Sequence, residues 1–322
     1  MLKTILAGSW FAAAVLCACP AHAEVAGGKA VSLVVSYPVG GGADLMARLI
    51  APKMSEALGQ PVVVDNKPGG AGQLAGALVA KAAPDGATLL FDASSFSVTP
   101  ALYPKMAYDP AKAFTPIAVL ALFPNVLVAN PQFPAANVRD VLAMAKAQPG
   151  RVAFASSGNG SAQHLAGALF EDIGKVDMLH VPYKGGGPAM NDVIAGQVPL
   201  FFANLASSLG QIQGNRLRPL AVTSKRRSPI LPNVPTIEEA GLAGYEVYEW
   251  NPILAPAGIS ADTRRQLVAA VQRAMAAPEV QERIRSLGGE VFTGDADAAA
   301  KFLQQQTELW ARVVREHNIK AE

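Results

Sequence analysis

Three segments of small residues constrain this chain most, because each lies where a β-rich run gives way to an amphipathic helical window. They are YPVGGGAD at 37–44, SSGNGS at 156–161 and VPYKGGGPA at 181–189. At such a junction an anion can approach bare backbone N–H groups, and the first helical turn adds unpaired donors and the positive end of its dipole. The sequence therefore predicts strand-to-helix units whose loops surround something small and anionic.

The alternation of short strands and helices continues along the chain. It is typical of α/β folds, in which helices cover parallel sheets. In such sheets ligands sit outside the carboxyl ends of the strands, which is where all three small-residue segments fall. We predict strands at 31–37, 62–65, 88–92, 117–122, 126–129, 152–155, 178–181, 200–202 and 217–223.

The helices have recognisable start and stop signals. The first runs from Asp44 to Leu58 and stops at Gly59. Pro52 lies inside it and removes one hydrogen bond, so we expect a kink there or two short pieces. Later helices are expected at 262–276 after Ser260 as cap, at 278–287 with Pro278 in the first position, and at 296–318 after Asp295 as cap.

The first 23 residues have the pattern of a secretory signal peptide. Lys3 is followed by the apolar run 5–16 and by the cleavage site Ala21-His22-Ala23. The alternative is a lipoprotein signal that leaves Cys19 as an acylated first residue. Both cysteines lie in this segment, so cleavage after Ala23 excludes disulfides and cysteine metal sites from the mature protein. We expect the mature protein in the periplasm.

Cleavage leaves about 300 residues, enough for two domains with separate cores. The segments 122–128 and 220–225 look like crossings between domains; at the first, one strand ends at Phe123-Pro124-Asn125 and another begins. We therefore predict one lobe from 24–124 and 224–322, a second lobe from 125–223 inserted into it, and a ligand cleft between the two lobes.

Charge and hydropathy exclude several classes of protein. The chain has a formal net charge of +2 at pH 7 and no basic run longer than 225–227, which argues against nucleic acid or a membrane surface as partner. The apolar stretch 117–129 is broken by Pro124 and Asn125 and is too short to span a bilayer.

Eight segments, taken in order, resemble the extracytoplasmic solute receptors of the tripartite tricarboxylate transporter family, often called Bug-type receptors. They are YPVGGGADLMAR, GQPVVVDNKPGGAGQLA, AKAAPDGATLL, TPALYPKMAYDP, FASSGNGSAQHLAG, HVPYKGGGPA, LRPLAVTSKRRSPILPNVPTIEEAG and ILAPAG. The resemblance implies a two-lobed type II periplasmic binding protein that closes on a small organic carboxylate. It also implies the membrane permease subunits of a tripartite transporter as partners. We expect a monomer with no cofactor and no metal.

The resemblance also implies ligand contacts in the first strand-to-helix loop. Backbone N–H groups of Gly41, Gly42 and Ala43 would donate to one ligand carboxylate, partly through water. The further candidates in this loop are Tyr37, Pro38, Gly40 and Asp44. Asp44 has an alternative role, as the N-cap of the helix.

In the second lobe the resemblance assigns hydroxyl and backbone donors to a second polar end of the ligand. The candidates are Ser156, Ser157, Gly158, Gly160 and Ser161, with Tyr183 in the following cradle. His164 lies on the same helix face as Ser161, and it either contacts the ligand or bonds to a neighbouring backbone group. Lys184 could offer a charge-assisted bond to an anion or stay solvated.

Two positions depart from the family pattern. In the loop 92–97, which supplies Ser94 and Ser95 as candidates, Phe96 replaces a more polar neighbourhood and predicts an apolar wall. Ala203, before the candidate Asn204, stands where many members carry aspartate. The loss of that carboxylate removes a partner for a ligand ammonium group and argues against amino-acid ligands.

Two other functions compete with transport. A sensing receptor would bind the same ligand and meet a signalling partner, and the sequence does not separate it from a transport receptor. A serine hydrolase would use Ser161, His164 and an acid such as Asp192, but the chain has no G-x-S-x-G elbow. The GNGS context of Ser161 at a helix start suits anion binding better than an exposed nucleophile.

Overall fold

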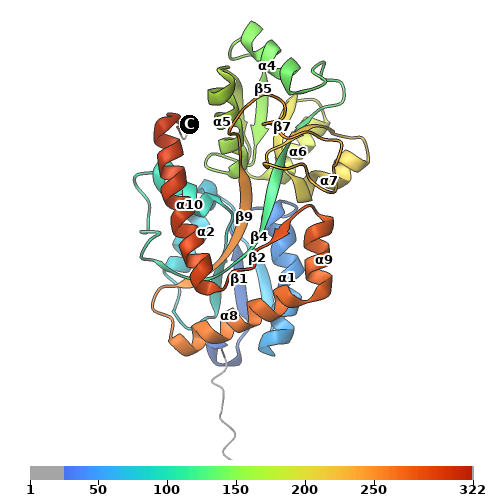
Figure 1. Cartoon of the computed structure of the whole chain (residues 1–322). Helices are drawn as coiled ribbons and strands as arrows, with labels where there is room; N and C mark the ends of the chain where they lie inside the picture. The colour runs from blue at the N-terminus through green and yellow to red at the C-terminus, as the bar shows by residue number, and fades with distance from the viewer. Residues whose placement is uncertain (1–24, 321–322) are drawn as a thin grey trace, which may run out of the picture.

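The chain forms two α/β lobes joined by two long strands (Figure 1). This computed structural model describes residues 25–320. The elements are η1 (Val25–Gly28), β1 (Val31–Val35), α1 (Gly42–Leu58), β2 (Val62–Asn66), η2 (Gly70–Gly72), α2 (Gln73–Ala80), β3 (Thr88–Phe91), α3 (Ser95–Leu102), β4 (Phe114–Ala129), α4 (Val138–Ala147), β5 (Ala153–Ser156), α5 (Ala162–Gly174), β6 (Leu179–Pro182), α6 (Gly186–Ile194), β7 (Leu200–Asn204), α7 (Leu205–Gln213), β8 (Arg218–Val222), β9 (Tyr248–Pro256), α8 (Ala261–Ala276), α9 (Pro278–Ser286), β10 (Glu290–Val291) and α10 (Ala296–Glu316).

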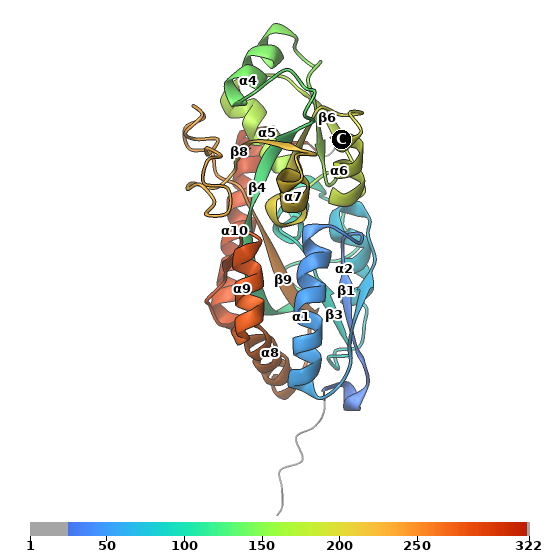
Figure 2. The ribbon, with the colours of Figure 1, turned by 90° about the vertical axis from the view of Figure 1, so that its right-hand side faces the viewer.

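The first lobe is built on a mixed sheet with the order β2-β1-β3-β9-β4-β10. Strands β1, β2 and β3 are parallel, whereas β9 runs antiparallel to both β3 and β4. Leu33 of β1 faces a core with α1, α8 and α9 on one side (Figure 2), and Val34 faces α2, α3 and α10 on the other. Both faces of the central strands β1 and β3 are therefore buried, whereas the edge strand β2 exposes Val63.

The second lobe has its own sheet, in the order β8-β4-β7-β5-β6. Strand β5 pairs in parallel with β6 and β7, and the end of β4 pairs antiparallel with β7 and β8. Val126, Phe201 and Val193 belong to one core cluster, in which α6 covers the sheet. The α/β alternation predicted from the sequence is confirmed in both lobes.

Strand β4 runs without interruption from Phe114 to Ala129, so the predicted break at residues 123–125 is wrong. Pro124 is the last residue paired with β9, opposite Tyr248, and Asn125 is the first paired with β7, opposite Asn204. Because the pairing partners change at this point, the missing N–H of the proline interrupts no continuous ladder. The strand itself is the first crossing between the lobes.

The second crossing is β9, a strand that the sequence patterns do not predict. Before it, the segment 224–247 stays against the second lobe: Tyr245 Oη donates to the carbonyl of Ala166, and Val247 N–H to that of Thr223. Strand β9 then pairs with β4 along the first lobe. The lobe boundaries at 124 and 223 remain predictions, and these contacts favour a second crossing near residue 248.

The helix signals act largely as predicted. Gly59 ends α1 in the left-handed conformation (φ 70°), and Ser260 and Asp295 cap α8 and α10 with their side chains. Helix α1 continues through Pro52 as one element of 17 residues, so the alternative of two short pieces is wrong. Packing of its buried face against α8 and the sheet outweighs one missing hydrogen bond.

The proposed signal peptide, including Cys17 and Cys19, lies outside the described residues. Among residues 25–320, no helix combines the length and the apolar character needed to cross a membrane.

Candidate functional site

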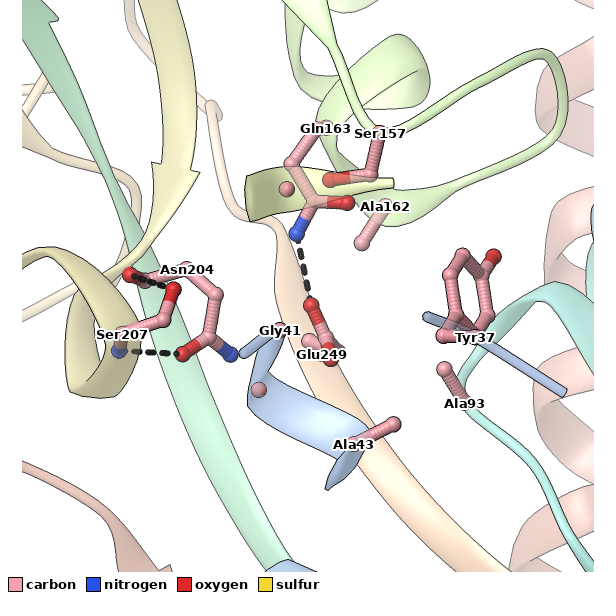
Figure 3. A pocket seen from close by; sticks show the side chains of 12 residues that line it. Tyr37, Gly41, Ala43, Ala93, Ser157, Ala162, Gln163, Asn204, Ser207 and Glu249 are labelled. Atoms are coloured by element: carbon pink, nitrogen blue, oxygen red, sulfur yellow. Dashed lines mark hydrogen bonds between the residues drawn. The ribbon is translucent and has the colours of Figure 1, made fainter. Parts of the chain in front are cut away.

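A small cavity lies between the lobes, beside both crossing strands (Figure 3). It holds about 20 Å³, room for about one water molecule, so the two lobes are closed on each other here. Its lining comes from both lobes: Tyr37, Gly41, Gly42, Ala43, Ala93, Ser157, Ala162, Gln163, Gly186, Asn204, Ser207 and Glu249.

Four helices begin at this cavity. The first turns of α1, α5, α6 and α7 contribute lining residues, α1 from the first lobe and the other three from the second. The leading N–H groups of a helix have no partner within it, and its N-terminus carries roughly half a positive charge. The cavity thus concentrates donors and positive potential without a basic side chain, since no Lys, Arg or His is found among its described lining residues.

Glycines permit the close approach of the lobes. A Cβ on Gly42 of α1 would lie 2.7 Å from the side-chain amide of Asn204, across the cleft. A Cβ on Gly185 would lie 2.3 Å from Pro38, again in the opposite lobe. Closure to this distance therefore requires residues without side chains at both points.

Two buried polar atoms of the lining have no hydrogen-bond partner within the protein: Tyr37 Oη and Asn204 Nδ2. Tyr37 is 9% exposed and Asn204 is 5% exposed. Asn204 is fixed by its other amide atom, because Oδ1 accepts from Ser207 N–H and caps α7. Unpaired buried donors are costly, so these two atoms are suited to bind a polar ligand or water.

Glu249 of β9 also lines the cavity and is 5% exposed. Gln163 Nε2 donates to its Oε2 at 2.6 Å and also to Asn125 Oδ1 at 2.7 Å. Burial raises the pKa of Glu249, while the hydrogen bond from Gln163 partly opposes this shift. A carboxyl group thus lies inside a cavity whose other features favour an anion.

A second buried acid, Asp92, lies at the end of β3 beside the cavity. Its carboxylate accepts from Ser36 Oγ, Ala93 N–H and Ser95 Oγ. Burial nevertheless raises its pKa to about 6. Because its contacts all lie within the first lobe, Asp92 orders the loop that carries Ala93 to the cavity.

Comparisons with known proteins identify the family of this chain. Residues 46–319 match the family model described as tripartite tricarboxylate transporter family receptor. The chain belongs to this family. BugT of Bordetella pertussis is 33% identical to this receptor over 305 residues, which cover 94% of each chain.

Solved structures agree with the family and with the two-lobed periplasmic binding fold. An R. palustris protein with adipate is 34% identical, with a TM-score of 0.87 and coverage of 91% of the receptor and 98% of that chain. MatC from Rhodopseudomonas palustris with bound malate is 33% identical, with a TM-score of 0.85 and coverage of 89% and 99%.

In the first loop of the receptor, four predicted contacts line the cavity and three do not. Tyr37, Gly41, Gly42 and Ala43 line it, whereas Pro38, Gly40 and Asp44 do not. Asp44 lies in the first turn of α1, whose N-cap is Gly41, so the proposed N-cap role is wrong in position. Its carboxylate accepts from Gly40 N–H, Arg48 Nε and Asn66 Nδ2, and is therefore occupied within the lobe.

In the serine-rich loop 156–161, Ser157 lines the cavity, whereas its neighbours make hydrogen bonds or backbone turns within the second lobe. Ser156 Oγ lies 2.6 Å from His180 Nε2, and Ser161 caps α5 by accepting from His164 N–H. Gly158 and Gly160 adopt positive φ of 116° and 79°. The structure does not place these four residues at the cavity.

His164 also points away from the cavity, and matches the interpretation of a histidine bonded to backbone. Its Nδ1 accepts from Gly160 N–H, and its ring stacks on that of His180 at 4.4 Å. Ser161 Oγ donates to the carbonyl of Gly158, so Ser161 and His164 do not form a nucleophile and base pair.

The remaining candidates are distributed among other contacts. Tyr183 donates to Asp192 at 2.7 Å, and Ser94 is buried beside the cavity without lining it. Phe96 packs edge-on against Phe114 on the side of α10, so the predicted apolar wall is wrong. Ala203 is buried in the second-lobe core opposite Val126, so it is not in the cavity.

Half of the residues that line the cavity were not predicted from the sequence. Ala162, Gln163 and Gly186 lie one to three positions from residues already singled out, at helix starts that the junction pattern had located. Ser207 lies three positions after Asn204, in the first turn of α7, a helix that was not predicted. Glu249 lies on the unpredicted β9. The signal available for it was an acidic residue among apolar neighbours in EVYEWNPIL, where a solvated acid is unexpected.

Proposed function

We propose that this receptor captures a small organic carboxylate by closing its lobes and delivers it to the membrane subunits of a tripartite tricarboxylate-type transporter in the periplasm. The observation that carries the proposal is the convergence of four helix N-termini, from both lobes, on one closed inter-lobe cavity. An anion held there contacts both lobes and so stabilises the closed form.

The composition of the lining favours a carboxylate bound by neutral donors. Backbone N–H groups, the Ser157 hydroxyl and the Nδ2 donor of Asn204 take the place of the arginines that many anion sites use. The relatives solved with malate and adipate support a dicarboxylate of four to six carbons as the first class to test. The present cavity is too small for either acid, so binding requires the lobes to open first.

The family to which the chain belongs, and no contact in the structure, supports the proposed delivery. A closed receptor presents a continuous surface formed by both lobes, which a permease can distinguish from the open form. No feature of the described residues favours a signalling partner or a hydrolytic reaction over this function.

The direct test is a thermal-shift screen followed by calorimetry on the mature protein. Malate, succinate, adipate, citrate and benzoate are compared with phosphate and with uncharged sugars at equal ionic strength. A carboxylate at about 100 times its Kd should raise the free energy of unfolding by about 2.7 kcal/mol. Stabilisation by sugars or phosphate but by none of the acids would contradict the proposal.

Transport is tested separately in the host cell. Deletion of the gene should abolish uptake of the radiolabelled acid that binds, and the wild-type gene should restore it. Normal uptake together with a lost transcriptional response to the acid would instead favour a sensing receptor.

A further inference from the structure

Glu249 is the one ionisable group that the described cavity lining contributes besides Tyr37. Figure 3 shows its carboxyl group between Gln163 from the second lobe and Ala43 from the first. Its strand, β9, is also one of the two connections between the lobes. A ligand that fills this space must therefore lie against the carboxyl group of Glu249.

The surroundings of Glu249 contain no positive side chain within the lining. From α5, Gln163 donates to it; from α7, Asn204 and Ser207 are neutral; and α1 and α6 contribute glycine and alanine. From the first-lobe strands, Asp92 and Tyr37 are the titratable neighbours, and the charge of Asp92 further disfavours ionisation of Glu249. Ionisation is favoured by the hydrogen bond from Gln163, by the nearby side-chain amide of Asn204 and by the field of the four helix N-termini.

A bound carboxylate changes this balance. The ligand competes for the same helix N-termini and brings a like charge against Glu249 in a site closed to water. Two carboxylates that share such a site cannot both stay ionised at low cost, and one of them takes up a proton.

Resting on the function proposed above, we propose that Glu249 takes up one proton from solvent when a carboxylate binds and then donates a hydrogen bond to it. Glu249 thus contributes to ligand specificity, because a carboxylate ligand binds beside it only when Glu249 also takes up a proton. Its neutral carboxyl retains an acceptor oxygen for Gln163 and uses the hydroxyl for the ligand. Binding then tightens as the pH falls towards the pKa of Glu249 in the open protein.

The test is calorimetry with malate and adipate in pairs of buffers that differ in ionisation enthalpy, between pH 5.5 and 8.5. Whichever of the two acids binds more tightly should take up close to one proton per site within part of this range. In the same interval its affinity should rise up to about tenfold for each unit of pH decrease.

Two variants test which residue takes up the proton when the ligand binds. Glu249→Gln keeps the acceptor for Gln163 and a donor for the ligand, so it should still bind, with proton uptake near zero and an affinity that is independent of pH. Asp92→Asn, the matched change at the neighbouring buried acid, should retain the uptake. Far-ultraviolet circular dichroism verifies that both variants fold.

The outcomes separate the inference from the proposed function. Binding of malate or adipate without proton uptake at any pH would overturn the role of Glu249 and leave the receptor function intact. Uptake that persists in Glu249→Gln, or that disappears only in Asp92→Asn, would also overturn it. Failure of the wild-type protein to bind any carboxylate would overturn the proposed function and this inference together.

Discussion

At the scale of single residues, Gly42 decides how closely the lobes meet. Its backbone is helical, so alanine suits it within the first lobe, yet a Cβ there would overlap the side chain of Asn204 in the second. Gly158 is different: at φ 116° and with a Cβ 2.8 Å from the carbonyl of Tyr183, a valine would distort its own loop. Loss of binding in Gly158→Val would therefore reveal nothing about ligand contact.

We expect Gly42→Ala to weaken binding while leaving the fold stable. Overpacking of the closed form costs about 1–3 kcal/mol, which corresponds to roughly a five- to 150-fold weaker affinity. Isothermal titration of the acid found in the screen measures the effect. Gly210→Ala is the matched control, because it places alanine in α7 where a Cβ meets nothing within 4 Å. Equal affinity in both variants would show that closure at Asn204 is not needed.

At Ala203 a substitution would likewise act on the fold of its own lobe. A substitution to aspartate there would place a carboxylate in the second-lobe core instead of the cleft. We expect Ala203→Asp to unfold the lobe or lower its stability by several kcal/mol, with burial of an unpaired charge as the reason. A chemical denaturation series measures this loss, and a fully stable variant with altered ligand preference would contradict the placement of Ala203.

At the scale of elements, a pair of histidines packs beneath the serine-rich loop 156–161 of the second lobe. His164 of α5 and His180 of β6 stack, and His180 also stacks on Phe154 of β5. Burial lowers the pKa of His164 to about 4, and burial together with His164 lowers that of His180 to about 3. Both rings are therefore neutral in the folded protein at pH 7.

The sign of the pH effect follows from these shifts. The unfolded chain binds protons on both histidines below about pH 6.5, whereas the folded protein does not until about pH 4. Their contribution to stability is present above pH 6.5 and is lost as the pH falls. Each histidine contributes a slope of up to about 1.4 kcal/mol per pH unit in this window.

His180→Asn should consequently be less stable than the wild type at pH 7, because stacking is lost, but should lose less stability between pH 6.5 and 4.5. Urea denaturation at several pH values gives both slopes. The difference between the proteins is the informative quantity, since Asp92, with its raised pKa, affects both equally and in the opposite direction. Parallel slopes would mean that His180 is protonated in the folded protein.

At the scale of the whole molecule, two strands carry the geometry of the cleft. Strands β4 and β9 pair with each other along the first lobe and lead into the second (Figures 1 and 2). Glu249 of β9 lines the cavity. Opening and closing must bend these strands while the helices that begin at the cavity move with their own lobes.

The absence of basic side chains from the described lining predicts a weak dependence of affinity on salt. Helix N-termini inside a closed site are screened little by ions, and the protein has a formal net charge of only +2 to steer an anion. We expect affinity to change by less than about threefold between 0.05 and 0.5 M NaCl. A tenfold or greater loss, measured by calorimetry at fixed pH, would point to exposed cations in the recognition step.

The sequence by itself determined the α/β class, most strand positions, the caps of α8 and α10, and three of the four loops at which helices begin at the cavity. These are local properties: a small residue, a cap or an apolar period acts on its own neighbourhood. For that reason the junction pattern located the segments 37–44 and 156–161, within which the resemblance singled out Gly41, Gly42 and Ser157, all of which line the cavity.

Tertiary structure decided which side of each element faces the cleft. Adjacent residues of a strand point in opposite directions, so Asn204 reaches the cavity while Ala203 is buried in the core. Long-range pairing placed β9 between β3 and β4. It thereby brought Glu249 next to cavity residues that are distant from it in the sequence. Such pairing depends on contacts between segments far apart in the chain, and no local pattern specifies them.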